Sequence, residues 1–424
     1  MAAMMVFVVF LVGIALSIPI GVSMILGSVA PIMLLGKGGT IVQVLNNTFS
    51  GANSTPILAV PLFILGGVIM AEGGISKKLF NFFAYFVGRF PGGVPCAVIM
   101  TCLFYGAISG SGPATTAAVG AMCIPFMVSL GYDKVWSAGL ISVAGGLGVI
   151  IPPSIPFVLY SLATGVSTGA LFLAGIIPGI LIGAVLMLVN YVVARKYGYG
   201  TLKKFNLKTL LTRLKDSIWA LLVPVIILGG IYGGIFTPTE SAVVAIVYSL
   251  IIGVFVYKEL DLKGIYATLR ETVLINGQTT FLVGLSLAFA RYLTMAQVPA
   301  KVAGSILNLS SPILILLMIN LLLLVIGCFI DNISSTVILT PILLPIVTGL
   351  GMSPIQFGIV MTVNLAIGFI TPPYGANLFY ASAVGKVSIE RIAAKIMPMI
   401  AVMLVVLLAL TFIPQISLGL LSLR

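Results

Sequence analysis

The fold is decided by two stretches of sequence, "GVIIPPSIPFVLYSLATG" at 148–165 and "GFITPPYGANLFYASAVG" at 368–385. Each places Pro-Pro inside an otherwise apolar run. Proline donates no backbone N–H and clashes with the preceding turn, so each stretch predicts a broken helix. The two stretches lie 220 positions apart, with Gly, Ile, Pro, Pro, Tyr, Ala and Gly in register. This shared offset indicates an internal repeat rather than two unrelated kinks.

The repeat extends upstream of both Pro-Pro breaks. Each copy holds a polar hairpin tip, "SGSGPATT" at 109–116 and "IDNISST" at 330–336. The pairs that share the offset without a gap are Thr116 with Thr336, Pro125 with Pro345, Leu130-Gly131 with Leu350-Gly351, and Val143 with Val363. Each copy therefore predicts a re-entrant helical hairpin, 92–131 or 312–350, followed by a broken helix, 135–165 or 354–385.

The composition indicates a membrane protein. The chain has 424 residues, of which 60% are hydrophobic and 7% are charged, whereas a soluble protein averages roughly 25% charged residues. Apolar runs of about 20 residues recur, which is the length that crosses a bilayer as a helix. We expect an all-α polytopic membrane protein with about eleven transmembrane helices and the two re-entrant helical hairpins.

The apolar runs and the amphipathic pieces give an expected order of elements. The runs interpreted as spans are 5–33, 56–71, 168–192, 217–236, 241–257, 273–294 and 397–418. The first of these is interpreted as one membrane helix rather than a signal peptide, because it lacks a basic n-region and is too long for an h-region. The shorter amphipathic pieces lie at 77–89, 259–272 and 386–396.

The basic residues set the expected orientation. Lys and Arg number 21 against 9 Asp and Glu, a net charge of +12, and they lie in short loops. This pattern indicates topology signals rather than nucleic-acid binding. Placing the most basic loop, 194–217, in the cytoplasm puts the N-terminus inside and the C-terminus outside. The two copies of the repeat then enter the membrane from opposite sides, which is typical of secondary transporters.

Other classes of function fit the sequence less well. The chain has no histidine and no G-x-x-x-x-G-K-[ST] motif, which excludes His-based catalytic sites and a P-loop ATPase. Nine acidic residues, mostly in loops, leave little for the proton transfer that an enzyme needs. A channel or a structural membrane subunit stays open as an alternative, although the inverted repeat favours a transporter.

The tips and breaks are the candidate site. Backbone outside a helix is tolerated at membrane depth only where protein or a water-filled cavity satisfies it. Two tips and two breaks near the midplane would offer carbonyl oxygens to cations and helix N-termini to an anion. Asp331 is the acid in this region, and it could serve an ion, cap a helix, or do both. Arg291 is interpreted as a side chain that snorkels at the outer face rather than as a substrate ligand.

Five motifs in order resemble a known family along essentially the whole chain. They are "GAISGSGPATTAAVGA" (106–121), "GGLGVIIPPSIP" (145–156), "GIFTPTESA" (234–242), "DNISSTVILTPILLPI" (331–346) and "GFITPPYGANLF" (368–379). Together they are similar to the large membrane subunit of a tripartite ATP-independent periplasmic (TRAP) transporter.

The resemblance implies a function and a set of partners. Such subunits import organic acid anions across the bacterial inner membrane with the sodium gradient, and a periplasmic solute-binding protein delivers the substrate. A small membrane subunit of about four helices completes the membrane part. It is expected as a separate chain, because this sequence begins with the first helix of the large subunit. The substrate is expected to be a sialic acid such as N-acetylneuraminate, a C4-dicarboxylate or a similar carboxylate. Sodium is the co-transported ion, with no organic cofactor and no nucleic acid.

The resemblance also implies a fold like that of divalent anion/sodium symporters, with a scaffold and an elevator-like transport domain. The expected divisions are scaffold helices and the arm of repeat 1 (1–91), the first transport-domain half (92–166), scaffold helices with the basic loop and the arm of repeat 2 (167–311), the second transport-domain half (312–386), and a C-terminal arm and membrane helix (387–424).

Residues of the tips and breaks are carried over onto this sequence as the expected site. The sodium ligands are expected among Ser109, Ser111, Gly112, Gly145, Gly148, Asp331, Asn332, Asn364, Gly368 and Thr371. The substrate ligands are expected among Thr116, Ser154, Thr336, Tyr374 and Asn377.

Overall fold

The computed structural model describes residues 2–36, 39–53, 55–199, 206–297, 311–373 and 375–422, and all its elements there are helical. The N-terminal elements are α1 (Ala2–Ala15), α2 (Ile20–Leu35), α3 (Ile41–Ala52), η1 (Thr55–Leu58), α4 (Ala59–Glu72) and α5 (Ile75–Val87). What we name the first repeat unit follows, with α6 (Gly93–Ser109), α7 (Gly112–Ser129), α8 (Lys134–Gly145), α9 (Leu147–Ile150) and α10 (Ile155–Thr164).

A second group of elements completes the chain. The middle elements are α11 (Thr168–Tyr197), α12 (Leu207–Tyr232), α13 (Pro238–Ile251), η2 (Ile252–Val256) and α14 (Leu262–Met295). The second repeat unit consists of α16 (Pro312–Gly327), α17 (Asn332–Gly349), α18 (Pro354–Gly368) and α19 (Ala376–Gly385). The last helices are α20 (Ile389–Phe412) and α21 (Pro414–Leu418).

The two repeat units have matching elements. α7 and α17 begin and end at residues that are 220 positions apart. Both helices start at an N-cap in the same register, because the side chains of Ser111 and Asp331 each accept a hydrogen bond from the backbone N–H three residues later. Each unit is then broken at Pro-Pro, between α9 and α10 and between α18 and α19. Both copies therefore contain two helices around a capped tip and then a broken helix; that the two helices form a re-entrant hairpin in the membrane stays a prediction.

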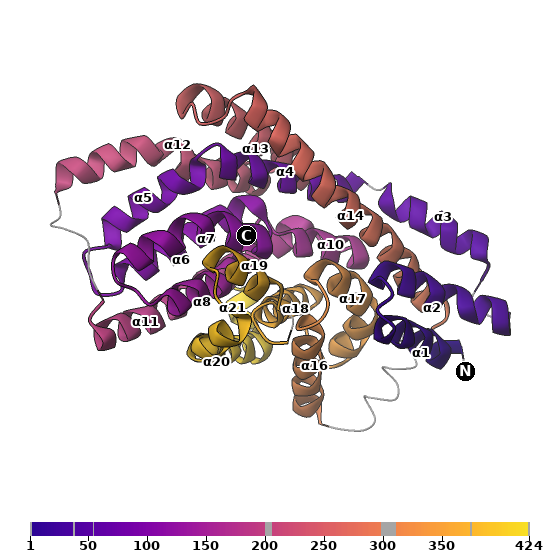
Figure 1. Ribbon diagram of the computed structural model, residues 1–424. Helices are drawn as coiled ribbons and strands as arrows, with labels where there is room; N and C mark the ends of the chain where they lie inside the picture. Colours follow the sequence, from indigo (N-terminus) through magenta and orange to yellow (C-terminus); the bar gives the residue numbers. More distant parts are fainter. Residues whose placement is uncertain are drawn as a thin grey trace.

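The two repeat units interlock. α10 of the first unit packs on α17 of the second, and α19 of the second unit packs on α7 of the first. These contacts can be followed in Figure 1, where α10 and α17 lie near the centre of the molecule. The broken segment from Lys134 to Thr164 is buried along its whole apolar window. Both Pro-Pro breaks therefore belong to one assembly built from the two halves of the chain.

The number of helices that could span a membrane is lower than expected. Eight described helices are long and apolar enough, or nine if α4 and α5 count as one bent span. Five apolar helices of 10 to 17 residues are too short by the same criterion, and they include the first hairpin arms α6 and α16. The predicted count of about eleven is therefore not confirmed, whereas an all-helical, multi-pass protein is.

The expected single span at 5–33 is wrong. The chain breaks at Ser17, which has a φ of 59°, and Pro19 precedes α2. α1 and α2 then pack against each other, and a Cβ built on Gly13 would lie 2.9 Å from the Cβ of Ser23. Because the residues around the break are themselves mostly apolar, the hydropathy pattern could not reveal it.

The amphipathic pieces fold in two ways. The piece at 77–89 corresponds to α5, which turns by 64° from α4. The pieces at 259–272 and 386–396 are not separate elements, because α14 is one helix of 34 residues and most of the second piece lies in α20. Local polarity alone did not distinguish an independent surface helix from the polar first turns of a long one.

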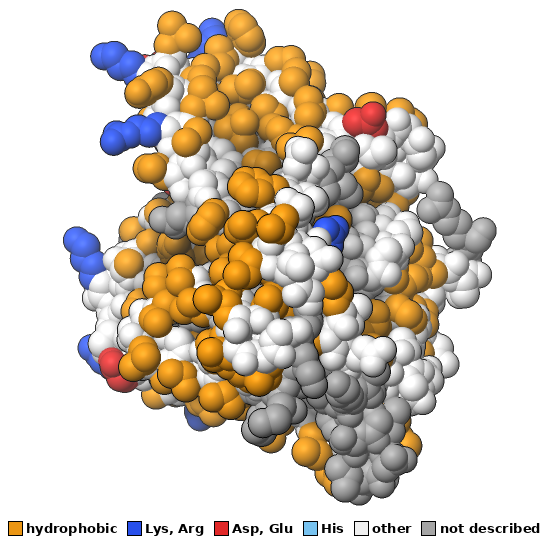
Figure 2. Space-filling view, turned by 90° about the vertical axis from the view of Figure 1, so that its right-hand side faces the viewer, with side chains coloured by type: hydrophobic (Ala, Val, Ile, Leu, Met, Phe, Trp, Pro, Cys, Tyr) orange, Lys and Arg blue, Asp and Glu red, His pale blue; other side chains and the backbone are white. Residues whose placement is uncertain are grey.

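The remaining helices form two groups by their packing, although α5 also packs on α6 and α14 also packs on α17 of the repeat units. α14 packs on α2, α3 and α4, and α12 packs on α5 and α13; we call this group, together with η1 beside α4, the scaffold. α11 instead packs on α6, α18 and α20, which belong to or adjoin the repeat units. On the face in Figure 2, hydrophobic side chains form much of the surface, and most of the Lys and Arg side chains in view lie along one edge. This distribution fits a lipid-facing belt with basic residues at one membrane face.

Candidate functional site

The first hairpin tip is built from hydroxyl groups and glycine. Gly110 ends α6 in a left-handed conformation with φ 60°, which glycine adopts without steric cost. The Ser109 hydroxyl lies 3.0 Å from that of Thr115, and Thr115 Oγ1 donates to the carbonyl of Ser111 at 2.7 Å. The tip therefore holds several oxygen atoms close together between α6 and α7.

The second tip carries a carboxylate in the equivalent place. Asp331 Oδ2 accepts from the Ser334 N–H at 3.0 Å, and Asp331 Oδ1 accepts from the Ser334 hydroxyl at 2.6 Å. Asn332 Oδ1 accepts from the Thr336 hydroxyl at 3.0 Å. The helix-cap interpretation of Asp331 is thereby confirmed. A role for it in ion binding stays a prediction.

The two tips meet at one small cavity of about 100 Å³, which we call the inner cavity. The described residues that line it come from both tips and both breaks: Gly110, Ser111, Pro113, Val149, Ile155, Pro156, Asp331, Asn332, Ile333 and Phe369. Ile155 N–H donates to the Gly110 carbonyl at 3.3 Å, which joins the first break to the first tip. The expected convergence of tips and breaks is therefore present in the structure.

The charges around the inner cavity favour a cation and an anion together. The first residues of α7, α10 and α17 line it, and helix N-termini carry partial positive charge. Among the described lining residues, Asp331 is the single charged side chain. An anion here would be held by backbone N–H dipoles, and a cation would be needed to offset the carboxylate.

Glycines let the breaks approach the tips. A Cβ on Gly148 would lie 2.7 Å from the Ser111 carbonyl oxygen, and a Cβ on Gly106 would lie 2.6 Å from the Cα of Gly148. In the second unit, a Cβ on Gly368 would lie 2.5 Å from the Cα of Gly327. Gly148 and Gly368 occupy equivalent positions in the repeat. Both therefore allow close backbone crossing directly beneath the hairpin tips.

The other sodium candidates of the first unit lie around its tip. The carbonyl oxygen of Gly145 lies 3.4 Å from a Cβ built on Gly112, so these two residues are adjacent. Thr116, which was expected to bind substrate, is buried beside them, and its hydroxyl donates to the Gly112 carbonyl at 3.0 Å. The structure thus gathers Ser109, Ser111, Gly112, Gly145 and Gly148.

The sodium candidates of the second unit are more dispersed. The Thr371 hydroxyl donates to the Ile367 carbonyl at 2.8 Å within the break. Asn364 is fully buried, and its Nδ2 donates to Asn320 Oδ1 at 2.8 Å, which ties α18 to α16. Its own Oδ1 has no hydrogen-bond partner among the described residues. Asn364 therefore lies in a polar contact between helices rather than on the wall of the inner cavity.

Asn377 crosses from the second unit into the first. Its Nδ2 donates to the Ser142 carbonyl at 3.1 Å, and its buried Oδ1 lacks a partner among the described residues. The same Oδ1 lies 3.3 Å from a Cβ built on Gly112. Expected as a substrate ligand, Asn377 is thus brought together with sodium candidates Gly112 and Gly145.

The remaining substrate candidates are buried or lie outside the described residues. Ser154 caps α10 and its hydroxyl donates to the Val149 carbonyl at 2.6 Å. Thr336 is fully buried in α17. Tyr374 lies outside the described residues. Substrate contact by any of these residues stays a prediction.

Further residues complete this region. Gly110, Thr115 and Phe369 lie in the tip and break stretches that the sequence predicted, and Gly110 and Phe369 line the inner cavity. Asn320, which holds Asn364, lies outside those stretches and was missed. Thr115 also carries a repeat signal, because Ser335 places a hydroxyl at the same offset of 220. The Asn320–Asn364 contact had no such signal, because neither residue has an amide counterpart in the first unit.

Comparison with known proteins identifies the family. The sequence model described as "Tripartite ATP-independent periplasmic transporter, DctM component" matches residues 7–416. The isethionate TRAP transporter permease protein DctMQ of Oleidesulfovibrio alaskensis is 46% identical over 412 residues, which are 97% of this chain and 64% of that protein. This chain thus spans less than two thirds of that relative.

Two further relatives match over most of their own length. The C4-dicarboxylate TRAP transporter large permease protein DctM of Pseudomonas aeruginosa is 41% identical, with 88% of this chain and 87% of that protein covered. The sialic acid TRAP transporter large permease protein SiaM of Vibrio cholerae is 35% identical, with 94% of each chain covered.

Two solved structures share the fold. The YdaH transporter of Alcanivorax borkumensis matches with a TM-score of 0.63 at 17% identity, covering 89% of this chain and 88% of that one. MtrF of Neisseria gonorrhoeae, described with a class of antimetabolite efflux pumps, matches with a TM-score of 0.62 at 14% identity, covering 88% and 83%.

Proposed function

The chain belongs to the DctM component family of tripartite ATP-independent periplasmic transporters, and from this premise we propose that it couples the import of an organic acid anion to the sodium gradient. It is a multi-pass permease subunit for solute uptake and not an enzyme. The observation that carries the proposal is the inner cavity, where the tips of both repeat units meet three helix N-termini.

Sodium would bind at the two tips. Sodium is a hard cation that suits oxygen ligands. The first tip offers mainly carbonyl and hydroxyl oxygens, from residues such as Ser109 and Ser111, and the carbonyl of Gly145 at the end of α8 lies beside it. The second tip offers the Asp331 carboxylate and the Asn332 amide oxygen. The unequal tips imply that the second sodium site depends more on side chains than the first.

The charge of Asp331 gives a physical reason why sodium binding and anion binding would be coupled. An anion that entered the inner cavity alone would meet an unpaired carboxylate, which is unfavourable in a site of low dielectric. A sodium ion at the second tip would offset this charge and leave the helix N-termini to attract the anion. Sodium binding would therefore precede or accompany anion binding.

The substrate class follows from the site and from the relatives. The described residues of the inner cavity include no Lys or Arg, so helix dipoles would hold the anionic group. The relatives are named for isethionate, C4-dicarboxylate and sialic acid. We therefore widen the expected carboxylate to an organic acid anion that carries a carboxylate or a sulfonate.

The packing supports a conformation that is open toward the cytoplasm. α10 and α17, which lead outward from the tips in the expected orientation, pack on scaffold elements α4, η1 and α14. Their repeat counterparts are α19 and α7. α19 packs on α7, α8 and α20, and α7 makes only minor contacts with scaffold helices α4 and α5. Phe379 and Tyr380 of α19 are exposed. The outer half of the interface is thus closed against the scaffold, and its inner counterpart is freer.

Import would proceed by movement of the repeat units along the scaffold. We include α11 and α20 in the moving body because they pack on α6, α8 and α18. A periplasmic solute-binding protein would deliver the anion, and a small membrane subunit would support the scaffold. The membrane would be the bacterial inner membrane, with the basic loop in the cytoplasm.

Reconstituted uptake tests this proposal. The chain and the small membrane subunit would be placed in liposomes, and the solute-binding protein would be added after a binding screen with isethionate, succinate and N-acetylneuraminate. We expect uptake only with an inward sodium gradient and all three proteins. Equal uptake with potassium, or with this chain alone, would contradict the proposal. Non-saturating flux that follows the anion gradient alone would favour a channel.

A further inference from the structure

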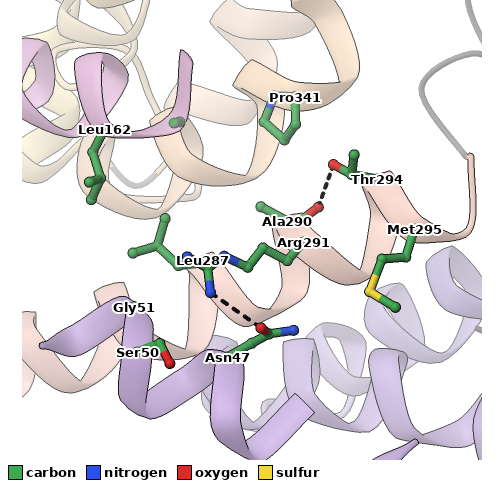
Figure 3. Close-up of a pocket in the computed structure, with 11 residues that line it drawn as sticks. Asn47, Ser50, Gly51, Leu162, Leu287, Ala290, Arg291, Thr294, Met295 and Pro341 are labelled. Carbon is green, nitrogen blue, oxygen red and sulfur yellow. Dashed lines mark hydrogen bonds between the residues drawn. The ribbon is translucent and has the colours of Figure 1, made fainter. Parts of the chain in front are cut away.

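A second, larger cavity lies away from the hairpin tips. Its volume is about 480 Å³, and we call it the outer cavity. Figure 3 shows it between α3 and α14 of the scaffold and helices α10 and α17 of the repeat units. Its described walls are mainly apolar, with Leu162, Leu287, Met295 and Pro341 among them. A cavity at this boundary adjoins the two bodies that must move past each other.

The outer cavity contains one cation. Arg291 is the single charged side chain among its described lining residues. Arg291 Nη1 donates to Asn47 Oδ1 at 3.2 Å, as the dashed line in Figure 3 marks. Ser50 and Thr294 place hydroxyl groups on the same walls. A guanidinium has five donors in a planar fork that matches the oxygens of a carboxylate or sulfonate, so further donors can serve a ligand.

The outer and inner cavities are arranged in series. α10 lines the inner cavity with Ile155 and the outer cavity with Leu162, and α17 does so with Ile333 and Pro341. Between them lies an apolar cluster that closes the interface. Its buried residues are Ile57, Val60, Ile155, Leu159, Val283, Leu287, Ala290 and Val337. An anion held at Arg291 would therefore be one apolar seal away from the hairpin tips.

We propose that the outer cavity is a receiving site for an organic anion, in which Arg291 pairs with the carboxylate or sulfonate while Asn47 orients the guanidinium. The proposal rests on the proposed function, because it places this site before the inner cavity on the import path. Arg291 lies near the end of α14 that the basic residues put at the periplasmic face. This assignment replaces the expectation that Arg291 only snorkels toward the membrane surface.

A thiol placed in the outer cavity can report the field of Arg291. Ser50→Cys would be made in the membrane complex, with the four native cysteines replaced by serine. Its rate of modification by the anionic reagent sulfonatoethyl methanethiosulfonate would be compared with the rate for the cationic trimethylammonium analogue. The ratio of the anionic to the cationic rate should be about tenfold higher at the Ser50→Cys thiol than for a simple thiol in solution.

Matched variants separate the charge of Arg291 from its packing. Arg291→Gln should remove the preference for the anionic reagent, and Arg291→Lys should keep most of it. Isethionate at millimolar concentration should slow the anionic reaction in the Arg291 protein several-fold but not in Arg291→Gln, and choline should slow neither. An equal preference in all three proteins, or no protection by isethionate, would overturn the receiving site.

A second cysteine position and a measurement without the solute-binding protein make the thiol-modification test decisive. Thr294→Cys would be measured in parallel, and failure of both thiols to react with either reagent would also overturn the proposal. The solute-binding protein is left out, so a role of Arg291 confined to docking that protein would keep the charge preference but give no protection by isethionate. Because the reactivity needs no sodium and no transport, its outcome is independent of the uptake test.

Discussion

At the scale of single residues, Asp331 shows how one side chain can hold two roles. The sequence left open whether this acid caps a helix or binds an ion, and the structure shows both carboxylate oxygens bonded to Ser334. Asp331 also lines the inner cavity, as Ser111 does. A cap needs an acceptor but no charge, whereas an ion site in a poorly solvated place depends on the charge. A substitution that keeps the cap therefore isolates the ionic role.

Asp331→Asn should weaken sodium dependence without loss of folding. Asn caps a helix about as well as Asp, so the start of α17 should persist. Loss of the charge should raise the sodium concentration for half-maximal uptake on the order of tenfold, because interactions with charged groups are worth roughly 1.5–3 kcal/mol. Ser111→Ala, at the equivalent cap, should have a milder effect. An unchanged sodium dependence in Asp331→Asn would reduce Asp331 to a helix cap.

Gly368 gives a second prediction at this scale, for stability. In Gly368→Ala the new Cβ would lie 2.5 Å from the Cα of Gly327, so α16 and α18 must separate. Overpacking of this kind costs about 1–3 kcal/mol. We expect the unfolding temperature in detergent to fall by several degrees. Gly229→Ala is the control, because no atom of the described residues lies within 4 Å of a Cβ built there. Equal unfolding temperatures of the two variants would show that α16 and α18 are not tightly packed at Gly327 and Gly368.

The sequence predicted part of this residue-scale picture. The offset of 220 pointed to Ser111, Asp331 and their neighbours, because a repeat places equivalent residues at equivalent turns. It could not place Asn364 against Asn320 or Asn377 against Gly112. Those contacts arise between segments that are far apart in the chain, and no local pattern records them.

At the scale of elements, the interlocking of the two repeat units decides the architecture. The repeat predicted hairpins and broken helices, and α7 and α17 even share their ends. Periodicity identifies helices but not their partners, so the exchange of α10 onto α17 and of α19 onto α7 became visible only in the structure. The break between α1 and α2 was missed for a different reason, because it is formed by residues that are mostly apolar.

The element-scale prediction concerns the apolar seal. A short thiol crosslinker that joins Leu287→Cys of α14 to Val337→Cys of α17 should stop uptake, because it fixes the scaffold to the moving body at a cluster they share. The control pair is Leu103→Cys with Gly183→Cys, where a Cβ on Gly183 lies 2.8 Å from Leu103 Cδ1. Both control residues are in the proposed moving body, so their crosslink should leave uptake intact. Uptake that survives the Leu287–Val337 crosslink but stops with the control crosslink would reject this division into scaffold and moving body.

At the scale of the whole molecule, two cavities and a seal lie along one interface. The inner cavity contains an acid and helix N-termini, the outer cavity contains Arg291, and the apolar cluster lies between them. Composition and charge predicted a multi-pass membrane protein, which the family match supports. They could not predict the outer cavity, because its walls come from α3, α10, α14 and α17. The proposed import therefore requires that the repeat units move as one body past the scaffold.

The most direct test is a distance measurement between spin labels in liposomes that contain the membrane complex. One label would replace exposed Val243 of scaffold helix α13, and the other would replace exposed Met397 of α20. We expect two distances between these labels, whose populations change when sodium and the loaded solute-binding protein are added. Labels at Leu188 of α11 and Met397 should keep one distance throughout. A single, unchanged distance between Val243 and Met397 under all conditions would contradict the account.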